Sequence, residues 1–443
     1  MAVPGRYDTV EKYLEEVFDF LKTYQWVFSS PNTYVLVNKV FDQFPSEWLP
    51  FLSDLSNDEL NELSVGVVSV HAPPSLQSFF QKINKLRFTL PKKISCEDFK
   101  FPNNSGLSNK KQHEIQSLAP LIHETCGRSD CDFIVDVGTG LVRGYLPRLL
   151  YDKYKYRVLG IEGCPQKFNL AKTKQKKYSD SDAAINYVEH FVTNESEHHI
   201  RQITKAFPMK HACITGLHAC ADLSVIILEL FTKLEFCKSL VIMPCCYHRL
   251  KQTEDGFENF PVSNLLKELT TKSGVLRFLK TPFLRLACQG FVGGFGNMTP
   301  EEHLARTNSC LFRAVLEDVA QSENYQVRRL KRKSGKLKQA DGHTEPFETY
   351  LATLKHTHAL IGGEITDHQF LDKMREKWTQ HKRDAHLVEA LAAFQAAMQS
   401  ICENVVLLDR VMFLKERGIE CFVVKVTDQG ISPRCHALVA VKP

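Results

Sequence analysis

The chain has 443 residues, a formal net charge of +5 and a pI near 8.4. This length exceeds one average domain, so we expect one large unit with a helical attachment. Hydrophobic residues at 43% and charged residues at 24% exclude wholesale disorder. Residues 1–7 lack a basic stretch followed by an apolar run, and no segment reaches the roughly 20 uninterrupted apolar residues that span a bilayer. We therefore expect an intracellular, cytoplasmic protein outside the membrane, with the nucleus as the alternative.

Fourteen cysteines are scattered through core-like segments. Without a secretory signal, such cysteines are expected to be reduced thiols rather than disulfides. Tetrahedral zinc sites use spacings such as C-x2-C with a second pair downstream, and the sequence contains no such arrangement. The sequence therefore predicts no metal site.

The first predicted region, residues 1–105, is mainly helical. Asp8-x-x-Glu11 and Ser56-x-x-Glu59 are capping-box patterns, and each precedes apolar residues at helical spacing. A run of turn formers at Pro102–Gly106 then marks a boundary, after which Ser108 can cap a new helix. We expect the main domain to occupy residues 106–322.

Strand-like apolar runs alternate with helical patterns through this main domain. Such alternation predicts a mostly parallel sheet with helices on both faces, a Rossmann-like α/β fold. The expected strands are Phe133–Val137, Arg157–Glu162, Ile185–Val192, Ala212–Leu217 and Leu240–Met243.

The C-terminal part of the chain is expected to hold an insertion and further strands. Thr299 can cap a helix that has Pro300 at its first position and that runs to about Gln321. Residues 323–403 are interpreted as a basic linker followed by a helical insertion, and residues 404–443 as strands that complete the sheet. These strands are Val405–Leu408, Cys421–Val426 and Ala437–Val441, which include a terminal antiparallel hairpin.

The loop after the first strand is the strongest functional signal. It reads Asp136-Val137-Gly138-Thr139-Gly140 and leads into a helical pattern at Tyr145–Tyr151. Glycine lets the backbone approach a ligand closely and a helix N-terminus offers free N–H groups, so we expect a nucleotide-like cofactor here. Glu162 ends the next strand, where a carboxylate can accept hydrogen bonds from two ribose hydroxyls. A nicotinamide-dependent oxidoreductase and an ordinary strand-to-helix turn remain as alternatives.

Polar side chains also follow the fourth and fifth strands, in Thr215–Asp222 and Met243–His248. Parallel sheets bind ligands outside the carboxyl ends of their strands, so these groups are expected to converge with the glycine loop. The side chains predicted to orient a substrate or remove its proton are His218, Asp222, Tyr247 and His248. A zinc site made of these two histidines with Cys220 and Cys246 is disfavoured, because their spacings match no common closed zinc motif.

Several of these stretches resemble the methyltransferase-like protein 25 family. The matching stretches are Ser108–Glu114, Asp136–Leu146, Thr215–Ser224, Pro244–His248, Phe260–Ser263, Leu407–Arg410 and Ser432–Arg434. The resemblance implies a class I methyltransferase fold, in which a seven-stranded sheet has an antiparallel last strand. It also implies S-adenosylmethionine as cofactor and methyl transfer to an unidentified acceptor. The residues expected to contact the cofactor are Lys111, His113, Asp136, Gly138, Gly140, Gly144, Glu162 and Leu217.

The glycine loop departs from the family pattern D-x-G-x-G-x-G-x-L. Val142 stands where the third glycine is expected, and the next glycine is Gly144. Removing Val142 and Arg143 restores the pattern, which indicates a two-residue insertion in the cofactor loop. A non-catalytic binding protein with the same fold is therefore the alternative function. Ala221 also replaces a common family glycine, which is tolerable if the backbone there is not left-handed.

A basic run follows the long helix that begins near Thr299. Seven cations stand between residues 328 and 338, and such a run could neutralise RNA phosphates. The cations assigned to RNA contact are Arg328, Arg329, Lys331, Arg332 and Lys333. Most charge runs are solvated linkers, which is the alternative. RNA, protein and small molecules all stay open as acceptors.

Overall fold

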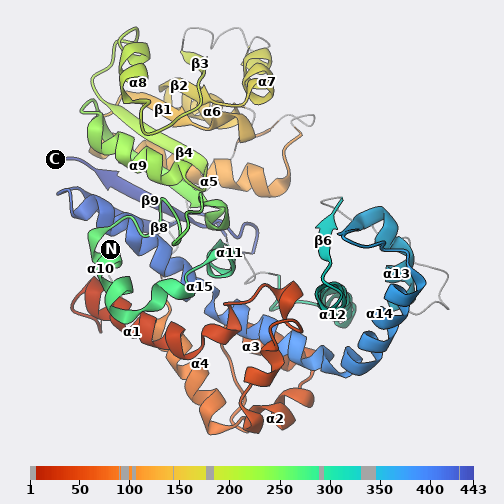
Figure 1. Cartoon of the computed structure of the whole chain (residues 1–443). Coiled ribbons are helices and arrows are strands. Elements are labelled where there is room, and N and C mark those ends of the chain that lie inside the picture. The colour runs from red at the N-terminus through yellow and green to blue at the C-terminus, as the bar shows by residue number, and fades with distance from the viewer. Residues whose placement is uncertain are drawn as a thin grey trace. The chain divides into compact units, whose positions relative to one another are not determined.

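The computed structural model describes residues 6–88, 90, 99–101, 106–142, 144–175, 184–288, 294–330, 346–428 and 430–443. The chain divides into two compact units (Figure 1). The first unit comprises Met1–Lys22, Leu86–Gly293 and Gln399–Pro443, and the second comprises Thr23–Lys85 and Gly294–Met398. The segment 1–105, predicted as one helical region, is therefore shared between the two units.

A seven-stranded sheet forms the centre of the first unit. Its strand order is β3-β2-β1-β4-β5-β9-β8, and β9 runs in the direction opposite to the other six strands. The strands are β1 Phe133–Val137, β2 Arg157–Glu162, β3 Ile185–Glu189, β4 Ala212–Cys220, β5 Cys237–Cys245, β8 Glu420–Lys425 and β9 His436–Val441. The five predicted parallel strands and the antiparallel C-terminal hairpin are confirmed.

Helices cover both faces of this sheet (Figure 1). They include α5 Asn109–Arg128, α6 Tyr145–Tyr154, α7 Pro165–Gln175, α8 Glu197–Thr204, α9 Leu223–Lys233 and α15 Ala385–Lys415. Successive strand residues point to opposite faces. Val135 packs in one buried cluster with Ile227 of α9, whereas Ile134 packs in another with Leu149 of α6. Each aliphatic side chain buried in this way contributes about 1.5–3 kcal/mol to stability.

Three further helices belong to the first unit, namely α1 Val10–Thr23, α10 Asn264–Ser273 and α11 Thr281–Cys288. The start of α1 differs from the prediction. The Thr9 hydroxyl, rather than Asp8, accepts the hydrogen bond of the Lys12 N–H at 3.2 Å, and Asp8 forms an exposed ion pair with the Lys12 ammonium. The predicted cap of α5 is confirmed, because Ser108 accepts a hydrogen bond from the Lys111 N–H.

The strand predicted at Val405–Leu408 is wrong. These residues are helical, and they lie inside α15, where almost every side chain from Val388 to Val411 is buried. A short apolar run that is buried on all sides carries no periodicity, so the run alone cannot separate a strand from a helix. The alanine-rich sequence that precedes it favours the helix.

Among the described residues, one segment could be considered as a membrane span by length and composition alone. This segment is His368–Lys415, and 94% of its apolar window is buried inside the structure. A core helix of a folded domain passes the same test, so the burial accounts for the apolar sequence without a membrane.

The second unit is mainly helical. Its helices are α2 Leu49–Ser53, α3 Asn57–Val65, α4 Pro74–Leu86, α12 Pro300–Ser322, α13 Pro346–Thr357, α14 His368–His381 and the beginning of α15. Strands β6 Gln326–Arg329 and β7 His358–Ile361 form a separate antiparallel pair. The predicted capping boxes at Ser56 and Thr299 are confirmed. Aromatic rings gather around Phe394, and those within 6.4 Å of it are Trp26, Phe44, Trp48, Phe79 and Phe80.

A fully buried ion pair fixes α15 to the start of α10 within the first unit. Asp409 accepts hydrogen bonds from the backbone N–H groups of Val262 and Ser263, and from the Ser263 hydroxyl at 2.9 Å. Its other oxygen receives the Arg410 guanidinium at 2.7 Å, and both charged side chains are 0% exposed. Burial lowers the pKa of Arg410 although Asp409 acts in the opposite direction. The charged form of each buried side chain is therefore stabilised by the opposite charge of the other.

Replacing Asp409 tests this dependence. Asp409→Ala is expected to lower the free energy of unfolding by about 3–5 kcal/mol, because it leaves a guanidinium buried without its counter-charge. The measurement is urea denaturation followed by circular dichroism. Glu416→Ala is the control, since Glu416 also accepts two N–H groups at the start of α10 but lies at the surface. Its cost is expected near 1 kcal/mol. Equal losses in the two variants would contradict this account.

Candidate cofactor and acceptor site

The glycine loop folds tightly onto the end of β2. Gly138 has a φ of +79°, and its N–H donates to the carbonyl of Ile161 at 2.8 Å. The Gly140 N–H donates to Oε2 of Glu162 at 2.8 Å. A Cβ at position 140 would lie 2.5 Å from Glu162 Oε2 and 2.6 Å from Cβ of Lys167, so only glycine permits this approach.

Glu162 joins the two turns that follow β1 and β2. Its second oxygen, Oε1, accepts the Cys164 N–H at 2.8 Å, and the side chain is buried. A carboxylate has about four acceptor positions, and these two backbone donors occupy one on each oxygen. One position on each oxygen is left for a ribose hydroxyl. The glycine cradle and this carboxylate therefore fit the nucleoside part of a cofactor.

Asp136 lies beneath the same loop at the end of β1. The side chain is 1% exposed, and its Oδ2 atom has no hydrogen-bond partner among the described residues. Burial raises its pKa to about 7, although the nearby Thr139 hydroxyl acts in the opposite direction. This carboxyl is therefore charged only in part near neutral pH, and it shapes the loop from below.

Tyr187 of β3 closes the other side of the loop, and the sequence did not predict this role. A Cβ at Gly160 would lie 2.6 Å from Cδ1 of Tyr187, and a Cβ at Gly144 would meet the Tyr187 hydroxyl. Gly144 has a φ of +73° and begins α6. The signal in the sequence was the pair of glycines, since each makes room for the same ring.

The predicted insertion in the glycine loop is described only in part. Val142 ends a short 3-10 turn, Thr139–Val142, and Arg143 lies outside the described residues.

A buried histidine lies beside a buried carboxylate near the end of β4. Nε2 of His218 is 3.2 Å from Oε2 of Glu114, and the Ser432 hydroxyl donates to Oε1 of Glu114 at 2.5 Å. Burial alone would raise the pKa of Glu114, but the hydrogen bond and charge of His218 outweigh burial and hold this pKa below its ordinary value. Glu114 was not among the predicted site residues, because 104 residues separate it from His218. Its position in the family-like stretch Ser108–Glu114 was the available signal.

An irregularity in β4 turns His218 toward Glu114. Gly216 pairs with Ile242 and Ala219 pairs with Pro244, so three steps along β4 match two steps along β5. One extra residue in a strand is a β-bulge, which changes the face to which the following side chains point. The bulge lets Leu217 pack in the cluster beneath α5 while the next residue, His218, also contacts α5.

The other predicted cofactor residues are spread along α5 and the core. The Lys111 N–H donates to the hydroxyl of Ser108, the residue that caps α5, and Nε2 of His113 accepts the Asp428 N–H at 3.1 Å. Leu217 is 4% exposed in the core cluster. The structure therefore brings together Asp136, Gly138, Gly140, Gly144 and Glu162, whereas His113 holds the loop before β9. Cofactor contact by Lys111, His113 and Leu217 stays a prediction.

Asp222 holds a loop beyond β4. Its carboxylate accepts the Lys251 N–H at 3.1 Å and the Asn259 side-chain amide at 2.8 Å. Ala221, directly before it, has a φ of +52°. The backbone is therefore left-handed at Ala221, and the condition for an unstrained replacement of glycine is not met.

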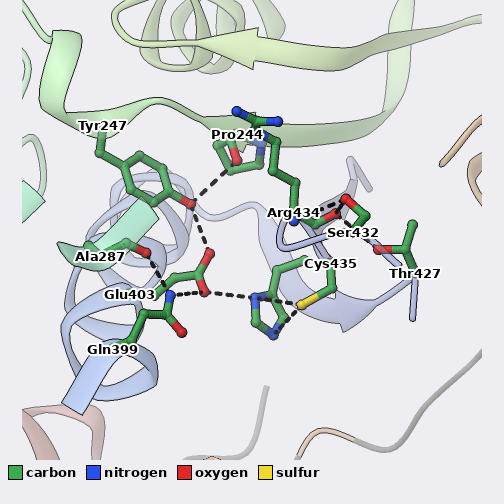
Figure 2. Close-up of polar contacts among 10 residues, drawn as sticks. Pro244, Tyr247, Ala287, Gln399, Glu403, Thr427, Ser432, Arg434 and Cys435 are labelled. Atoms are coloured by element: carbon green, nitrogen blue, oxygen red, sulfur yellow. Dashed lines mark hydrogen bonds and ion pairs between the residues drawn. The ribbon is translucent and has the colours of Figure 1, made fainter. Parts of the chain in front are cut away.

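Tyr247 and His248 are also engaged by neighbours. Figure 2 shows the Tyr247 hydroxyl directed at Glu403, and it lies 3.4 Å from both Glu403 Oε1 and the Pro244 carbonyl. Glu403 in turn pairs with His436 at 3.3 Å. Burial raises the pKa of Tyr247 well above its ordinary value. Nδ1 of His248 lies 2.9 Å from Sγ of Cys288. Roles for both residues in catalysis stay predictions.

Comparisons with known proteins find a methyltransferase domain in this chain. Residues 110–253 match the family model described as a methyltransferase domain. The chain is 27% identical over 270 residues to probable methyltransferase-like protein 25 of Homo sapiens, which covers 57% of this chain and 40% of that protein. The Mus musculus protein of the same name is 26% identical over 246 residues, which covers 53% of this chain and 38% of that protein. The chain thus spans less than half the length of these curated relatives.

Solved structures also match, at low similarity. Coclaurine N-methyltransferase bound to N-methylheliamine and SAH is 11% identical, with a TM-score of 0.27 over 93% of this chain and all of that one. The plantazolicin methyltransferase BamL, in complex with a triazolic desmethylPZN analog and SAH, is 11% identical, with a TM-score of 0.23 over 75% of this chain and 92% of that one. Scores this low carry no argument about detail, so the fold assignment rests on strand order and the matched domain.

The sheet has seven strands and its last strand, β9, is antiparallel, as the family resemblance implied. The matched domain contains the glycine loop, Glu162, His218 and Tyr247. The predicted class I methyltransferase fold is confirmed, and so is the resemblance to methyltransferase-like protein 25.

Replacing Asp136 tests the effect of its burial. The folded state holds a proton on Asp136 up to about pH 7, whereas the unfolded chain releases it near pH 3.8. The wild-type free energy of unfolding therefore falls as pH rises through this window, and Asp136→Asn removes that fall. Relative to wild type, the variant should gain on the order of 2–4 kcal/mol between about pH 4 and 7.5 in denaturant titrations. Exposed Asp255→Asn should show no such gain. A pH-independent difference for Asp136→Asn would refute this explanation.

Proposed function

We propose that this chain is an S-adenosylmethionine-dependent methyltransferase. The observation that carries the proposal is the Glu162 carboxylate, which holds Gly140 at 2.8 Å and keeps an acceptor position on each oxygen. It does so at the carboxyl ends of parallel strands, where α/β sheets bind nucleotide-like ligands. The match of residues 110–253 to a methyltransferase domain supports the same activity.

S-adenosylmethionine, when bound, supplies an electrophilic methyl group on a sulfonium. The residues of the chain have to position an acceptor in line with that methyl and accept its proton where it carries one. His218 suits the second task, because the buried carboxylate of Glu114 lies 3.2 Å from its Nε2 atom and orients the imidazole ring. Nδ1 of His218 would take the proton. Asp222, Tyr247 and His248 support this end of the sheet through their loop contacts.

A non-catalytic binding protein with this fold is the second candidate. The observation that favours it is the insertion of Val142 and Arg143 between Gly140 and Gly144, in the loop that would hold the methionine part of the cofactor. The loss of catalysis in that case would follow from a pocket that no longer accepts the cofactor.

Calorimetric titration of S-adenosylmethionine into the full chain separates the two candidates. Wild type is expected to bind with micromolar affinity, about −8 kcal/mol. Glu162→Gln should weaken binding at least about tenfold, because an amide cannot accept from both backbone N–H groups and two ribose hydroxyls. Glu189→Gln is the matched control, since Glu189 pairs in register with Glu162 on the neighbouring strand and is exposed.

The outcomes differ for each candidate. Binding by wild type that Glu162→Gln abolishes and Glu189→Gln preserves supports the methyltransferase. Binding only after Val142 and Arg143 are deleted supports the non-catalytic protein. Equal binding by wild type and Glu162→Gln would show that the cofactor does not use this carboxylate.

We also propose RNA as the acceptor class. The support is the exposed strand β6, where Arg328 and Arg329 are both at the surface, together with the basic run that continues from it. The predicted contacts Lys331, Arg332 and Lys333 lie outside the described residues. Successive strand residues point to opposite faces, so β6 itself offers one of its two arginines to a given surface. The lysines and arginine that follow would supply the remaining phosphate contacts.

Fluorescence anisotropy with a labelled single-stranded RNA tests this contact. Charge reversal of Arg328, Arg332 and Lys333 together should weaken binding and lower the slope of log K against log salt by roughly 2, because each phosphate contact on a single strand contributes about 0.7 of a unit. Reversal of Lys382 and Arg383, exposed cations of the same unit, should change the slope little. An unchanged slope in the triple variant would remove the support for RNA.

An intracellular location is proposed as well. The thirteen cysteines within the described ranges are all free of disulfide bonds. Reduced thiols in such number are usual in a reducing compartment.

A further inference from the structure

Three thiols meet where β4 and β5 end side by side. Cys220 is the last residue of β4, and Cys245 is the last of β5 and pairs with Cys220 in register. Their Sγ atoms are 3.0 Å apart. Cys246 follows directly, and the three Sγ atoms all lie within 4.8 Å of one another. Cys245 is buried and the other two are half-buried.

The backbone on each strand end is constrained into a rare conformation beside this cluster. Ala221 has a φ of +52° and Cys246 a φ of +54°, although neither is glycine. The Ala221 N–H donates to the Cys245 carbonyl at 2.9 Å, which ties the two turns together. Left-handed conformations of this kind cost about 1–3 kcal/mol each and gather at ligand sites. The left-handed conformation of Cys246 places its sulfur atom next to those of Cys220 and Cys245.

A cationic side chain lies beside the cluster. Nη2 of Arg434 lies 3.7 Å from Sγ of Cys246. Three thiolates and one divalent cation carry a net charge of −1, which the Arg434 guanidinium offsets. An outer cation that donates to a ligand sulfur is a usual second layer around a metal.

We propose that Cys220, Cys245 and Cys246 form a three-thiolate site for Zn²⁺. Sulfur ligands at about 2.3 Å in tetrahedral arrangement are roughly 3.8 Å apart, which lies between the 3.0 Å and 4.8 Å of this cluster. Among the described residues no fourth His, Cys, Asp or Glu donor joins the group, so the fourth position stays open to water. An open position is typical of functional rather than structural zinc.

This site differs from the one that the sequence disfavoured. The two histidines considered there have other partners, since His218 pairs with Glu114 and His248 contacts Cys288. Cys245 takes their place because strand pairing, rather than sequence spacing, sets it opposite Cys220. The prediction of no metal site depended on the spacing of ligands along the chain. Such spacing does not reveal that Cys220 and Cys245 lie opposite each other on two paired strands.

Metal content and cobalt substitution test the proposal. The full chain, purified after exposure to Zn²⁺ and desalted, should retain about one zinc ion per chain by mass spectrometry. Co²⁺ added to the metal-free protein should give intense sulfur-to-cobalt absorption in the near ultraviolet. Cys246→Ala should lower zinc content at least about tenfold. Cys288→Ala is the control, because Cys288 is a nearby half-buried thiol outside the group.

A second measurement uses wild type alone, so it tests the site even if Cys246→Ala does not fold. Alkylation of wild type followed by peptide mass spectrometry should show the half-buried Cys220 and Cys246 protected by Zn²⁺, and Cys164 equally reactive with and without it. Retained zinc with this protection supports the site. No retained zinc, no sulfur-to-cobalt absorption, or protection elsewhere would overturn it. These readouts omit S-adenosylmethionine, so they fail or succeed independently of the proposed methyl transfer.

Discussion

A buried carboxylate stays ionised only when hydrogen bonds or charges satisfy its oxygens, and this constraint organises three contacts within the first unit. Glu162 satisfies its oxygens with two turns of its own sheet, Glu114 with His218 and Ser432, and Asp409 with Arg410 and the start of α10. Each carboxylate therefore holds a segment outside the strands by hydrogen bonds: the turn after β2, the residues before β9 or the start of α10. The site is assembled by these contacts more than by the strands themselves.

These contacts also explain why separate stretches of sequence share the family resemblance. Phe260–Ser263 meets Leu407–Arg410 through Asp409, and Ser432–Arg434 meets Ser108–Glu114 through Glu114. The end of Thr215–Ser224 meets Pro244–His248 through strand pairing. Stretches far apart in the chain thus form contacting pairs in the folded unit. A side chain in one stretch of a pair therefore limits which residues can stand at the contacting position of the other stretch.

The sheet was predictable because its strands are short apolar runs bounded by turn formers, and the loop at Gly138 carries its signal in adjacent residues. The strand at Val405–Leu408 failed because a fully buried run has no periodicity. Glu114 and Tyr187 were missed for another reason. Their roles depend on His218 and on Gly144 and Gly160, which are distant in sequence, and no local pattern encodes such a pairing. The same holds for Cys245 opposite Cys220.

Because of the bulge in β4, the number of residues at this strand end decides which face of the sheet each side chain reaches. One extra residue between Gly216 and Ala219 lets Leu217 and His218 both reach the α5 side. A substitution at His218 would alter one side chain, whereas loss of one residue there would exchange the faces of every residue up to Cys220. An insertion or deletion between Gly216 and Ala219 would therefore redirect more side chains of this strand end than a single substitution there.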